Sequence, residues 1–370
     1  MKRMDATTNP ASGQIRSVQC LRAIAALFVV GYHATLLLHD NFMPEAKVWN
    51  NGNAGVDLFF VISGFIMVVS SQRLVGEVDG WQRFIVARLI RIVPMYWLAT
   101  AVKLLSAAAT PEMARNTFLT TWNSIASFLF LPSFDGAGLV RPVLHVGWTL
   151  SYEMLFYVIF AAALFLARDP LIVIVPALLA LASVSIVVQP DWPAITAFAS
   201  PFLLEFLVGT LIGHAFLTKR LQAISRAWAL PTGAAGLVGL GVLPVEGAWE
   251  RVAIWGSAAS AAVGGGVVCE PWLGRRLPKP AIDIGEASYS MYLTHGFVLP
   301  VVGVALAKLV TTDLAFGIVL VASCLAMSTV AALLIHKWVE APMTNSLRYM
   351  VQERQGPIWR RKKLRPLRRS

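Results

Sequence analysis

Residues 18–38 read VQCLRAIAALFVVGYHATLLL. An α-helix rises about 1.5 Å per residue, so a run of this length crosses the roughly 30 Å hydrocarbon core of a membrane. Comparable apolar runs follow at 54–71, 84–105, 146–166, 170–188, 194–217, 227–245, 251–269, 287–309 and 314–338. A briefer apolar stretch, 124–132, is too short to cross, which indicates a re-entrant or interfacial segment. The pattern predicts an all-α, polytopic integral membrane protein with about ten transmembrane helices.

The composition is that of a membrane protein. Hydrophobic residues make up 57% of the 370 positions and charged residues 14%, against about 25% charged in soluble domains. The net charge of +11 does not indicate nucleic-acid binding, because the basic residues lie between the apolar runs and in the tails. The sequence has no zinc-type Cys/His spacing, so we expect no metal site. No small-residue cleavage site follows the first run, which favours a retained helix over a signal peptide.

The distribution of basic residues predicts the topology. With ten spans, 24 of the 31 lysines and arginines lie on the side of the N-terminus and 6 on the opposite side. The positive-inside rule therefore places both termini in the cytoplasm. We expect a transmembrane domain over residues 1–345 and a basic cytoplasmic tail over 346–370, whose RRKKLRPLRR segment at 360–369 is typical of a topology anchor that attracts anionic lipids.

Ionisable residues inside the spans point to a polar site, because a charge at that depth costs about 2.5 kcal/mol or more and usually has a function. Arg22 and His33 lie eleven residues apart in the first span. Eleven residues are close to three helical turns, so both side chains project from one face, about 16 Å apart along the axis. The predicted topology puts Arg22 near the cytoplasmic end and His33 in the outer half. We interpret this stripe as functional and not as a snorkelling arginine plus a packing histidine.

Further polar residues fall in the second, third, fourth and ninth spans. Asp57 begins the second span at a depth similar to that of His33, where a carboxylate can orient an imidazole. Arg88 and Arg91 share a face of the third span on the cytoplasmic side and, with Arg22, are suited to a phosphate clamp. Three more candidates are Glu153 in the fourth span, and Tyr292 and His295, which share a face of the ninth. Glu205 and His214, in the sixth span, are suited to bonding between helices, and the pattern assigns them no further role.

Six ordered segments resemble the acyltransferase-3 family of bacterial membrane acyltransferases. They are LRAIAALFVVGYHA at 21–34, GVDLFFVISGF at 55–65, ARLIRIVPMYW at 87–97, GWTLSYEMLFY at 147–157, GEASYSMYLTHGF at 285–297 and VEAP at 339–342. Arg22 and His33 match the family's Arg-x10-His motif, and Arg88 and Arg91 its Arg-x-x-Arg motif. The Tyr-Glu-Met sequence at 152–154 and Glu205 in LLEF are most similar to the exopolysaccharide-modifying branch.

The resemblance implies transfer of an acyl group, acetyl as the default, from cytoplasmic acyl-CoA to a sugar hydroxyl of a surface glycan at the bacterial inner membrane, with acyl-CoA as co-substrate and no bound cofactor. Arg22, Arg88 and Arg91 would hold the CoA phosphates. His33 would act as general base or carry the acyl group, and Asp57 would orient it. Glu153 would hold the acceptor or assist proton transfer, while Tyr292 and His295 would line the site.

Two other functions fit a polytopic protein with buried charge. One is a transporter or flippase of polysaccharide or lipid-linked saccharide, although the chain shows no paired halves or matched broken helices. The other is a non-catalytic partner in a polysaccharide export complex. The sequence leaves open the acyl group, the sugar and position acylated, a direct or two-step transfer, and the oligomeric state.

Overall fold

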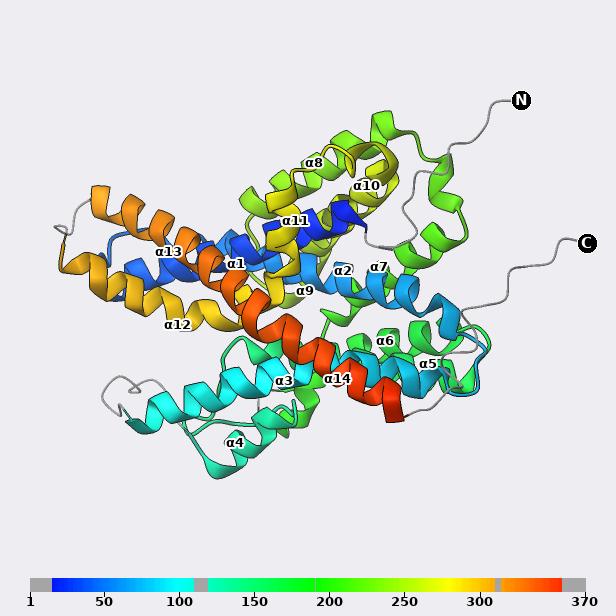
Figure 1. Ribbon diagram of the computed structural model, residues 1–370, viewed down its shortest axis with the longest axis horizontal. Helices are drawn as coiled ribbons and strands as arrows, with labels where there is room; N and C mark the ends of the chain where they lie inside the picture. The colour runs from blue at the N-terminus through cyan, green and yellow to red at the C-terminus, as the bar shows by residue number, and fades with distance from the viewer. Residues whose placement is uncertain (1–14, 110–118, 190, 310–313, 355–370) are drawn as a thin grey trace, which may run out of the picture. The chain divides into compact units, whose positions relative to one another are not determined.

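The computed structural model describes residues 15–109, 119–189, 191–309 and 314–354, and these are helical over most of their length (Figure 1). Within these ranges the only β-pairing is an isolated bridge between Phe134 and Val140. The basic segment predicted at 360–369 lies outside the described residues.

Fourteen α-helices and six short 3-10 or π segments follow one another along the described chain. They are α1 (Arg16–Asn41), η1 (Asn50–Asn53), α2 (Ala54–Ser71), η2 (Gln72–Leu74), α3 (Gly80–Ala109), α4 (Thr121–Phe128), α5 (Gly147–Leu166), α6 (Leu171–Val184), η3 (Ala194–Phe198), α7 (Leu203–Leu217), η4 (Arg220–Ala223), α8 (Arg226–Val242), α9 (Ala248–Arg251), η5 (Val252–Gly256), α10 (Ser257–Leu273), α11 (Lys279–Glu286), α12 (Ser288–Ala307), α13 (Leu314–Ile335), η6 (His336–Glu340) and α14 (Ala341–Arg354).

Eight helical segments of the described chain are long and apolar enough to cross a membrane, so the protein is an all-helical, polytopic membrane protein. They are Arg16–Asn41, Asn50–Leu74, Gly80–Ala109, Gly147–Leu166, Ala194–Leu217, Ala248–Leu273, Ser288–Ala307 and Ala315–Val351. The runs at 170–188 and 227–245 form the shorter helices α6, of 14 residues, and α8, of 17 residues. Fourteen residues rise only about 21 Å, so apolar length overestimated the helix at 170–188.

The last span is longer than the sequence predicts. The sequence predicts a final span over 314–338, which ends directly before the VEAP segment at 339–342. In the structure α13 continues through one π-helical stretch, η6, into α14, which ends at Arg354. The helix therefore extends past residue 345, and residues 346–354 at the start of the expected tail are helical.

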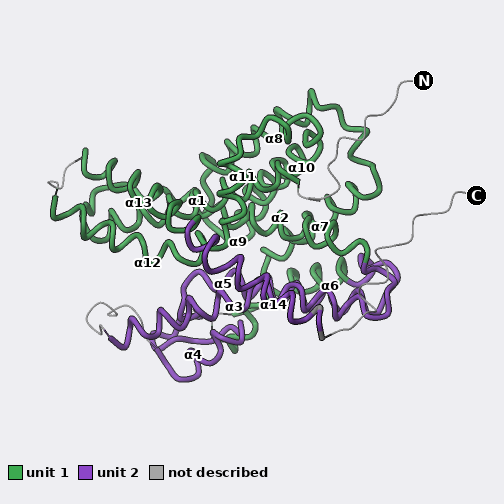
Figure 2. Tube along the Cα trace, viewed as in Figure 1, with its two compact units in different colours: residues 1–73, 174–333 green, residues 74–173, 334–370 purple. Residues whose placement is uncertain are grey.

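The chain forms two compact units, coloured separately in Figure 2. Unit 1 contains residues 1–73 and 174–333, and unit 2 contains residues 74–173 and 334–370. In unit 1, α1 packs against α2, α11 and α12, α2 packs against α7, and α8 packs against α10. In unit 2, α3 packs against α5 and α14.

Glycines allow the closest helix contacts in unit 1. A Cβ atom on Gly64 of α2 would lie 2.1 Å from the carbonyl oxygen of Phe206, and one on Gly209 of α7 would lie 2.0 Å from that of Val61. The two glycines thus face each other's backbones across the α2–α7 contact. Small residues that let backbones approach are the usual basis of helix pairing in membranes, where lipid is as apolar as the side chains.

The N-terminus of α1 is capped from a distant part of unit 1. The backbone N–H groups of Arg16 and Ser17 donate to the carboxylate of Glu270 on α10, at 2.9 and 2.8 Å. A carboxylate at this position satisfies two N–H groups that have no partner within the helix and complements the helix dipole. This cap fixes the start of the helix that carries Arg22 and His33.

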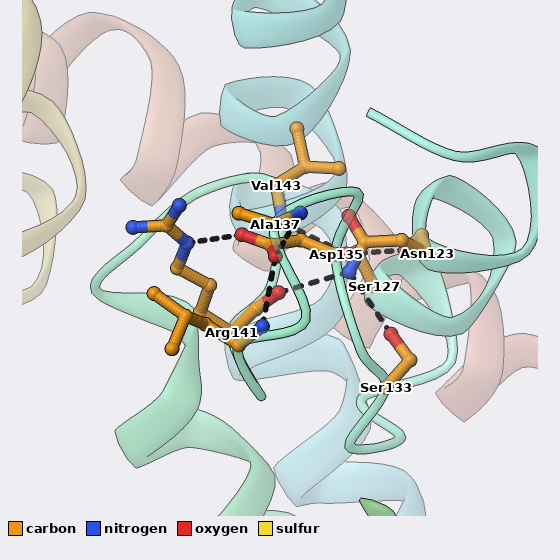
Figure 3. A network of polar contacts seen from close by, with 8 residues as sticks. Asn123, Ser127, Ser133, Asp135, Ala137, Arg141 and Val143 are labelled. Atoms are coloured by element: carbon orange, nitrogen blue, oxygen red, sulfur yellow. Dashed lines mark hydrogen bonds and ion pairs between the residues drawn. The ribbon is translucent and has the colours of Figure 1, made fainter. Parts of the chain in front are cut away.

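In unit 2 the stretch expected to be re-entrant or interfacial forms α4 and an ordered loop (Figure 3). The carboxylate of Asp135 accepts hydrogen bonds from the N–H groups of Ala137 and Leu139 and pairs with Arg141. Burial by itself raises the pKa of Asp135, but the donors from Leu139, Arg141 and Ala137 outweigh it, and the pKa lies below its ordinary value. Asn123 of α4 donates to Ser133 and to the carbonyl of Arg141, which ties the loop to the helix.

Candidate active site

Two histidines from distant parts of the sequence meet in unit 1. His33 lies on α1 and His295 on α12, and their ring centroids are 4.8 Å apart. His295 is buried, with 1% of its surface exposed, whereas His33 is partly exposed. Tyr292, one turn before His295, lies with its ring centroid 6.2 Å from that of His295. The structure therefore brings together three of the residues that the sequence singled out.

Each histidine is oriented by its own helix. Nδ1 of His33 lies 2.9 Å from the carbonyl oxygen of Val29, and Nδ1 of His295 lies 3.2 Å from that of Met291. A carbonyl oxygen only accepts hydrogen bonds, so Nδ1 carries the hydrogen in both rings. In the neutral imidazole this leaves the lone pair on Nε2, which is the nitrogen able to act as a base or nucleophile.

Asp57 does not have the partner that we expected. It was predicted to orient His33, but both of its oxygens accept hydrogen bonds from Arg251. Nε of Arg251 lies 3.0 and 3.1 Å from the two oxygens and Nη2 lies 2.7 Å from Oδ2. The tautomer of His33 is set instead by the carbonyl of Val29. This contact lies within one helix, since Val29 is about one turn before His33.

Arg251 is a site residue that sequence reasoning missed. It ends α9, directly before the π-helical segment η5, and its guanidinium lies 5.1 Å from the ring centroids of both Phe202 and Trp255. Nη2 also donates to the carbonyl of Asn53. The count of basic residues placed Arg251 on the outer side, at the first position of the predicted span 251–269. Its position on the outer side could have indicated a function, because the positive-inside rule disfavours arginine on that side of the membrane.

Glu205 of α7 belongs to the same cluster. Its side chain lies within hydrogen-bonding reach of Asp57, and both carboxyl groups are buried, with Glu205 1% and Asp57 0% exposed. Gly256 packs against Glu205, since a Cβ atom there would lie 3.1 Å from Oε1. The sequence suggested only a bond between helices for this residue.

Unit 2 holds a cluster of arginines around a carboxylate. Arg88 on α3 interacts electrostatically with Arg91, with Glu153 of α5 and with Arg348 of α14. Tyr157, one turn after Glu153, donates its hydroxyl to Oε1 of Glu153 at 2.5 Å. Sequence reasoning missed Arg348, because we expected the last span to end before it. The predicted pair of arginines is thus a group of three, next to the predicted Glu153.

The predicted residues are divided between the two units. Arg22, His33, Asp57, Tyr292 and His295 belong to unit 1, and Arg88, Arg91 and Glu153 belong to unit 2. Arg22 and His33 lie on the uninterrupted helix α1, so the shared face inferred from their spacing follows from the observed structure. Among the described residues no group of three or more His, Cys, Asp and Glu side chains is arranged to hold a metal ion.

A helical membrane protein with a pair of adjacent histidines and clustered arginines has the groups needed for acid–base or nucleophilic chemistry on an anionic substrate. The family model described as an acyltransferase domain matches residues 15–337, which is most of the chain. The chain belongs to this acyltransferase family and is a membrane-bound O-acyltransferase.

Curated relatives include three membrane or glycan-related proteins. The chain is 39% identical over 264 residues to the exopolysaccharide production protein ExoZ of Rhizobium meliloti, covering 69% of this chain and 78% of that protein. It is 29% identical over 175 residues to the peptidoglycan O-acetyltransferase OatA of Listeria monocytogenes, covering 44% and 26%. It is 33% identical over 162 residues to the putative membrane-bound transacylase BcsY of Komagataeibacter xylinus, covering 41% and 38%. No solved structure matches the chain.

Proposed function

We propose that the protein transfers an acyl group, acetyl as the default, from acyl-CoA to a sugar hydroxyl of an exopolysaccharide at the bacterial inner membrane. The likeness to an exopolysaccharide production protein over most of both chains supports the acceptor class. The likeness to a peptidoglycan O-acetyltransferase supports acetyl transfer to a saccharide. The observation that carries the proposal is His33, held by the carbonyl of Val29 with Nε2 as its basic nitrogen and packed against His295.

In a direct transfer, Nε2 of His33 takes the proton of the sugar hydroxyl while the hydroxyl oxygen attacks the thioester carbonyl. The carbon–sulfur bond breaks, and the departing thiolate takes the proton from the imidazolium, so that an ester and free CoA are formed. The hydrogen bond to Val29 keeps the ring orientation and stabilises the imidazolium, because Nδ1–H donates more strongly when the ring is charged. A positioned general base of this kind contributes about 10²–10⁴-fold to a rate.

In a two-step transfer, Nε2 of His33 attacks the thioester carbonyl, the carbon–sulfur bond breaks, and CoA leaves as the thiolate, so that His33 carries the acyl group as an acyl-imidazolium. The sugar hydroxyl then attacks the acyl carbon and the carbon–nitrogen bond breaks, which returns neutral His33, while a second base takes the hydroxyl proton and passes it to the thiolate. His295, with its ring 4.8 Å from His33 and its own Nδ1–H donated to Met291, is placed to be that base. Both routes use His33, and only the two-step route also uses His295.

Arg88, Arg91 and Arg348 form the proposed binding site for the phosphates of acyl-CoA. Guanidinium groups match phosphate oxygens with pairs of hydrogen bonds, and several of them in one place suit the multiply charged CoA headgroup. Electrostatic interaction of Arg348 with both other arginines supports a common site on α3 and α14. In unit 1, Arg22, on the face of α1 that carries His33, is a separate candidate for binding a phosphate.

Glu153 is proposed to hold the acceptor or to assist proton transfer in unit 2. The hydroxyl of Tyr157 fixes one of its oxygens, and Arg88 lies near it. A carboxylate held in this way can accept a hydrogen bond from a sugar hydroxyl.

The test compares His33→Ala with a matched control on the same helix. His39 also bonds a carbonyl through Nδ1, at 2.9 Å from Ala46, and it lies near the end of α1 away from His295. We expect His33→Ala to insert normally and to leave the exopolysaccharide unacylated, and His39→Ala to keep full acylation, as measured by NMR of the polymer. Full acylation by His33→Ala would overturn the assignment of His33.

A further inference from the structure

The acidic pair of unit 1 is the strongest feature that the proposed chemistry does not use. Asp57 on α2 and Glu205 on α7 come together at the α2–α7 contact, where Gly64 and Gly209 let the two backbones approach. Both carboxyl groups are removed from solvent. Two carboxylates in one buried place repel each other strongly unless other groups compensate.

Hydrogen-bond donors reach only one of the two carboxyl groups. Arg251 directs three hydrogen bonds to Asp57 and a fourth to the carbonyl of Asn53. Neither oxygen of Glu205 receives a hydrogen bond from a donor anywhere in the described ranges. The backbone at Gly256 encloses Glu205 on another side. An ionised carboxylate only accepts hydrogen bonds, so Glu205 in that form would be buried with no donor.

One proton shared between Asp57 and Glu205 removes both the repulsion of the carboxylates and the missing donor. If Glu205 carries it, the Glu205 hydroxyl donates to Asp57, which then accepts from Arg251 and from Glu205. The charge also balances, since one carboxylate faces one guanidinium. The proton belongs on Glu205 and not on Asp57, because Arg251 donates to Asp57 and favours its ionised form.

We propose that Glu205 is a protonated carboxylic acid that donates to Asp57, and that this one-proton cluster positions the histidine pair. The second half of the proposal rests on the proposed role of His33. The cluster reaches the pair through Tyr292, which interacts electrostatically with Arg251 and whose ring contacts Phe59 and His295. Glu205 and Arg251 are thus positioning residues for the transfer.

The groups that face Glu205 determine the direction of its pH dependence. They are Asp57 from α2 and Arg251 from α9, with Tyr292 of α12 near Arg251. Loss of the proton at high pH leaves two adjacent negative charges against one guanidinium and removes the donor to Asp57. Stability and transfer that depend on the cluster are therefore present at lower pH and lost as the pH rises through the titration of Glu205.

The experiment compares wild type, Glu205→Gln and Glu205→Ala in the full-length protein, purified in detergent. The glutamine amide can donate to Asp57 as the protonated acid does, but it cannot ionise. We expect the infrared spectrum of wild type to contain the C=O band of a protonated carboxylic acid, which Glu205→Gln removes. In wild type we expect acetyl transfer to decline at alkaline pH. Glu205→Gln should retain most of the transfer without this decline, whereas Glu205→Ala should lose about tenfold.

Two results would overturn the proposal. One is an acid band that is unchanged in Glu205→Gln, which would place the proton elsewhere. The other is a Glu205→Gln variant as impaired as Glu205→Ala, which would mean that a charged carboxylate is required. The infrared measurement needs no turnover, so it decides the protonation of Glu205 even if His33→Ala proves to be active and the proposed function fails.

Discussion

Gly209→Ala should damage both the fold and the site, because α7 has no room for a methyl group at this position. The new Cβ atom would lie 2.0 Å from the carbonyl oxygen of Val61. Carbon–oxygen contacts across helix interfaces are about 3.3 Å or longer, so α2 and α7 must separate locally by more than 1 Å. Overpacking costs about 1–3 kcal/mol, and we expect about 3 kcal/mol here because the obstructing atom is backbone and has no rotamer to move to.

The site is affected because Glu205 lies one turn before Gly209 on the same helix. A displacement of α7 withdraws Glu205 from Asp57, so acetyl transfer should fall together with stability. The matched control is Gly264→Ala in the interior of α10, where no heavy atom lies within 4 Å of the added Cβ. There the same methyl should stabilise the protein by about 0.4–1 kcal/mol, since alanine loses less backbone entropy than glycine.

The measurement is reversible unfolding of the purified variants in detergent, followed by transfer activity at a temperature where all of them are folded. The two variants should differ by roughly 3–4 kcal/mol, in opposite directions from wild type. If Gly209→Ala is as stable as Gly264→Ala, the close approach of α2 and α7 is not present in the protein, and the geometry of the acidic pair would have to be reconsidered.

Three further predictions follow from unit 2. Arg348→Ala and Arg88→Ala should each raise the KM for acetyl-CoA with little change in kcat. The control Arg73→Ala, at an exposed position, should change neither constant. An unchanged KM for Arg348→Ala would exclude α14 from the binding site. Tyr157→Phe removes the donor to Glu153 and should lower the free energy of unfolding by about 1–2 kcal/mol, which thermal unfolding can measure. Asp135→Asn should loosen the loop at 133–141 at neutral pH, and hydrogen exchange can measure this. In wild type the loop should stay protected above the ordinary pKa of aspartate and open only as the pH falls through the lowered pKa of Asp135. Equal exchange in both proteins at neutral pH would contradict the stabilising role of Asp135.

Most of the fold could be predicted from apolar length alone. Eight of the predicted spans are helices long enough to cross a membrane. The errors arose where the apolar run and the observed helix differ in length. The apolar run at 170–188 is helical only from Leu171 to Val184. The last helix continues through a π-helical stretch and past a proline to Arg354. Hydropathy measures the preference of side chains for lipid and contains no information on where a helix stops.

The candidate site, too, was predicted only in part. His33 and His295 were found because an ionisable side chain in an apolar run is costly wherever the helix packs. Arg251 was missed because it stands at the outer end of the predicted span 251–269, where it was counted only as a charge flanking the membrane. Its partner Asp57 is 194 positions away in the sequence, and no local pattern connects the two.

The sequence by itself determined eight membrane-spanning helices, the shared face of Arg22 and His33 and the family, since each depends on the order and spacing of residues along the chain. The tertiary structure decided which buried charges meet. It paired Asp57 with Arg251 in place of His33, set Glu205 beside them and added Arg348 to the arginines of α3. The physical reason is that electrostatic partners are chosen by distance in space, and that distance is fixed only when helices far apart in the chain pack together.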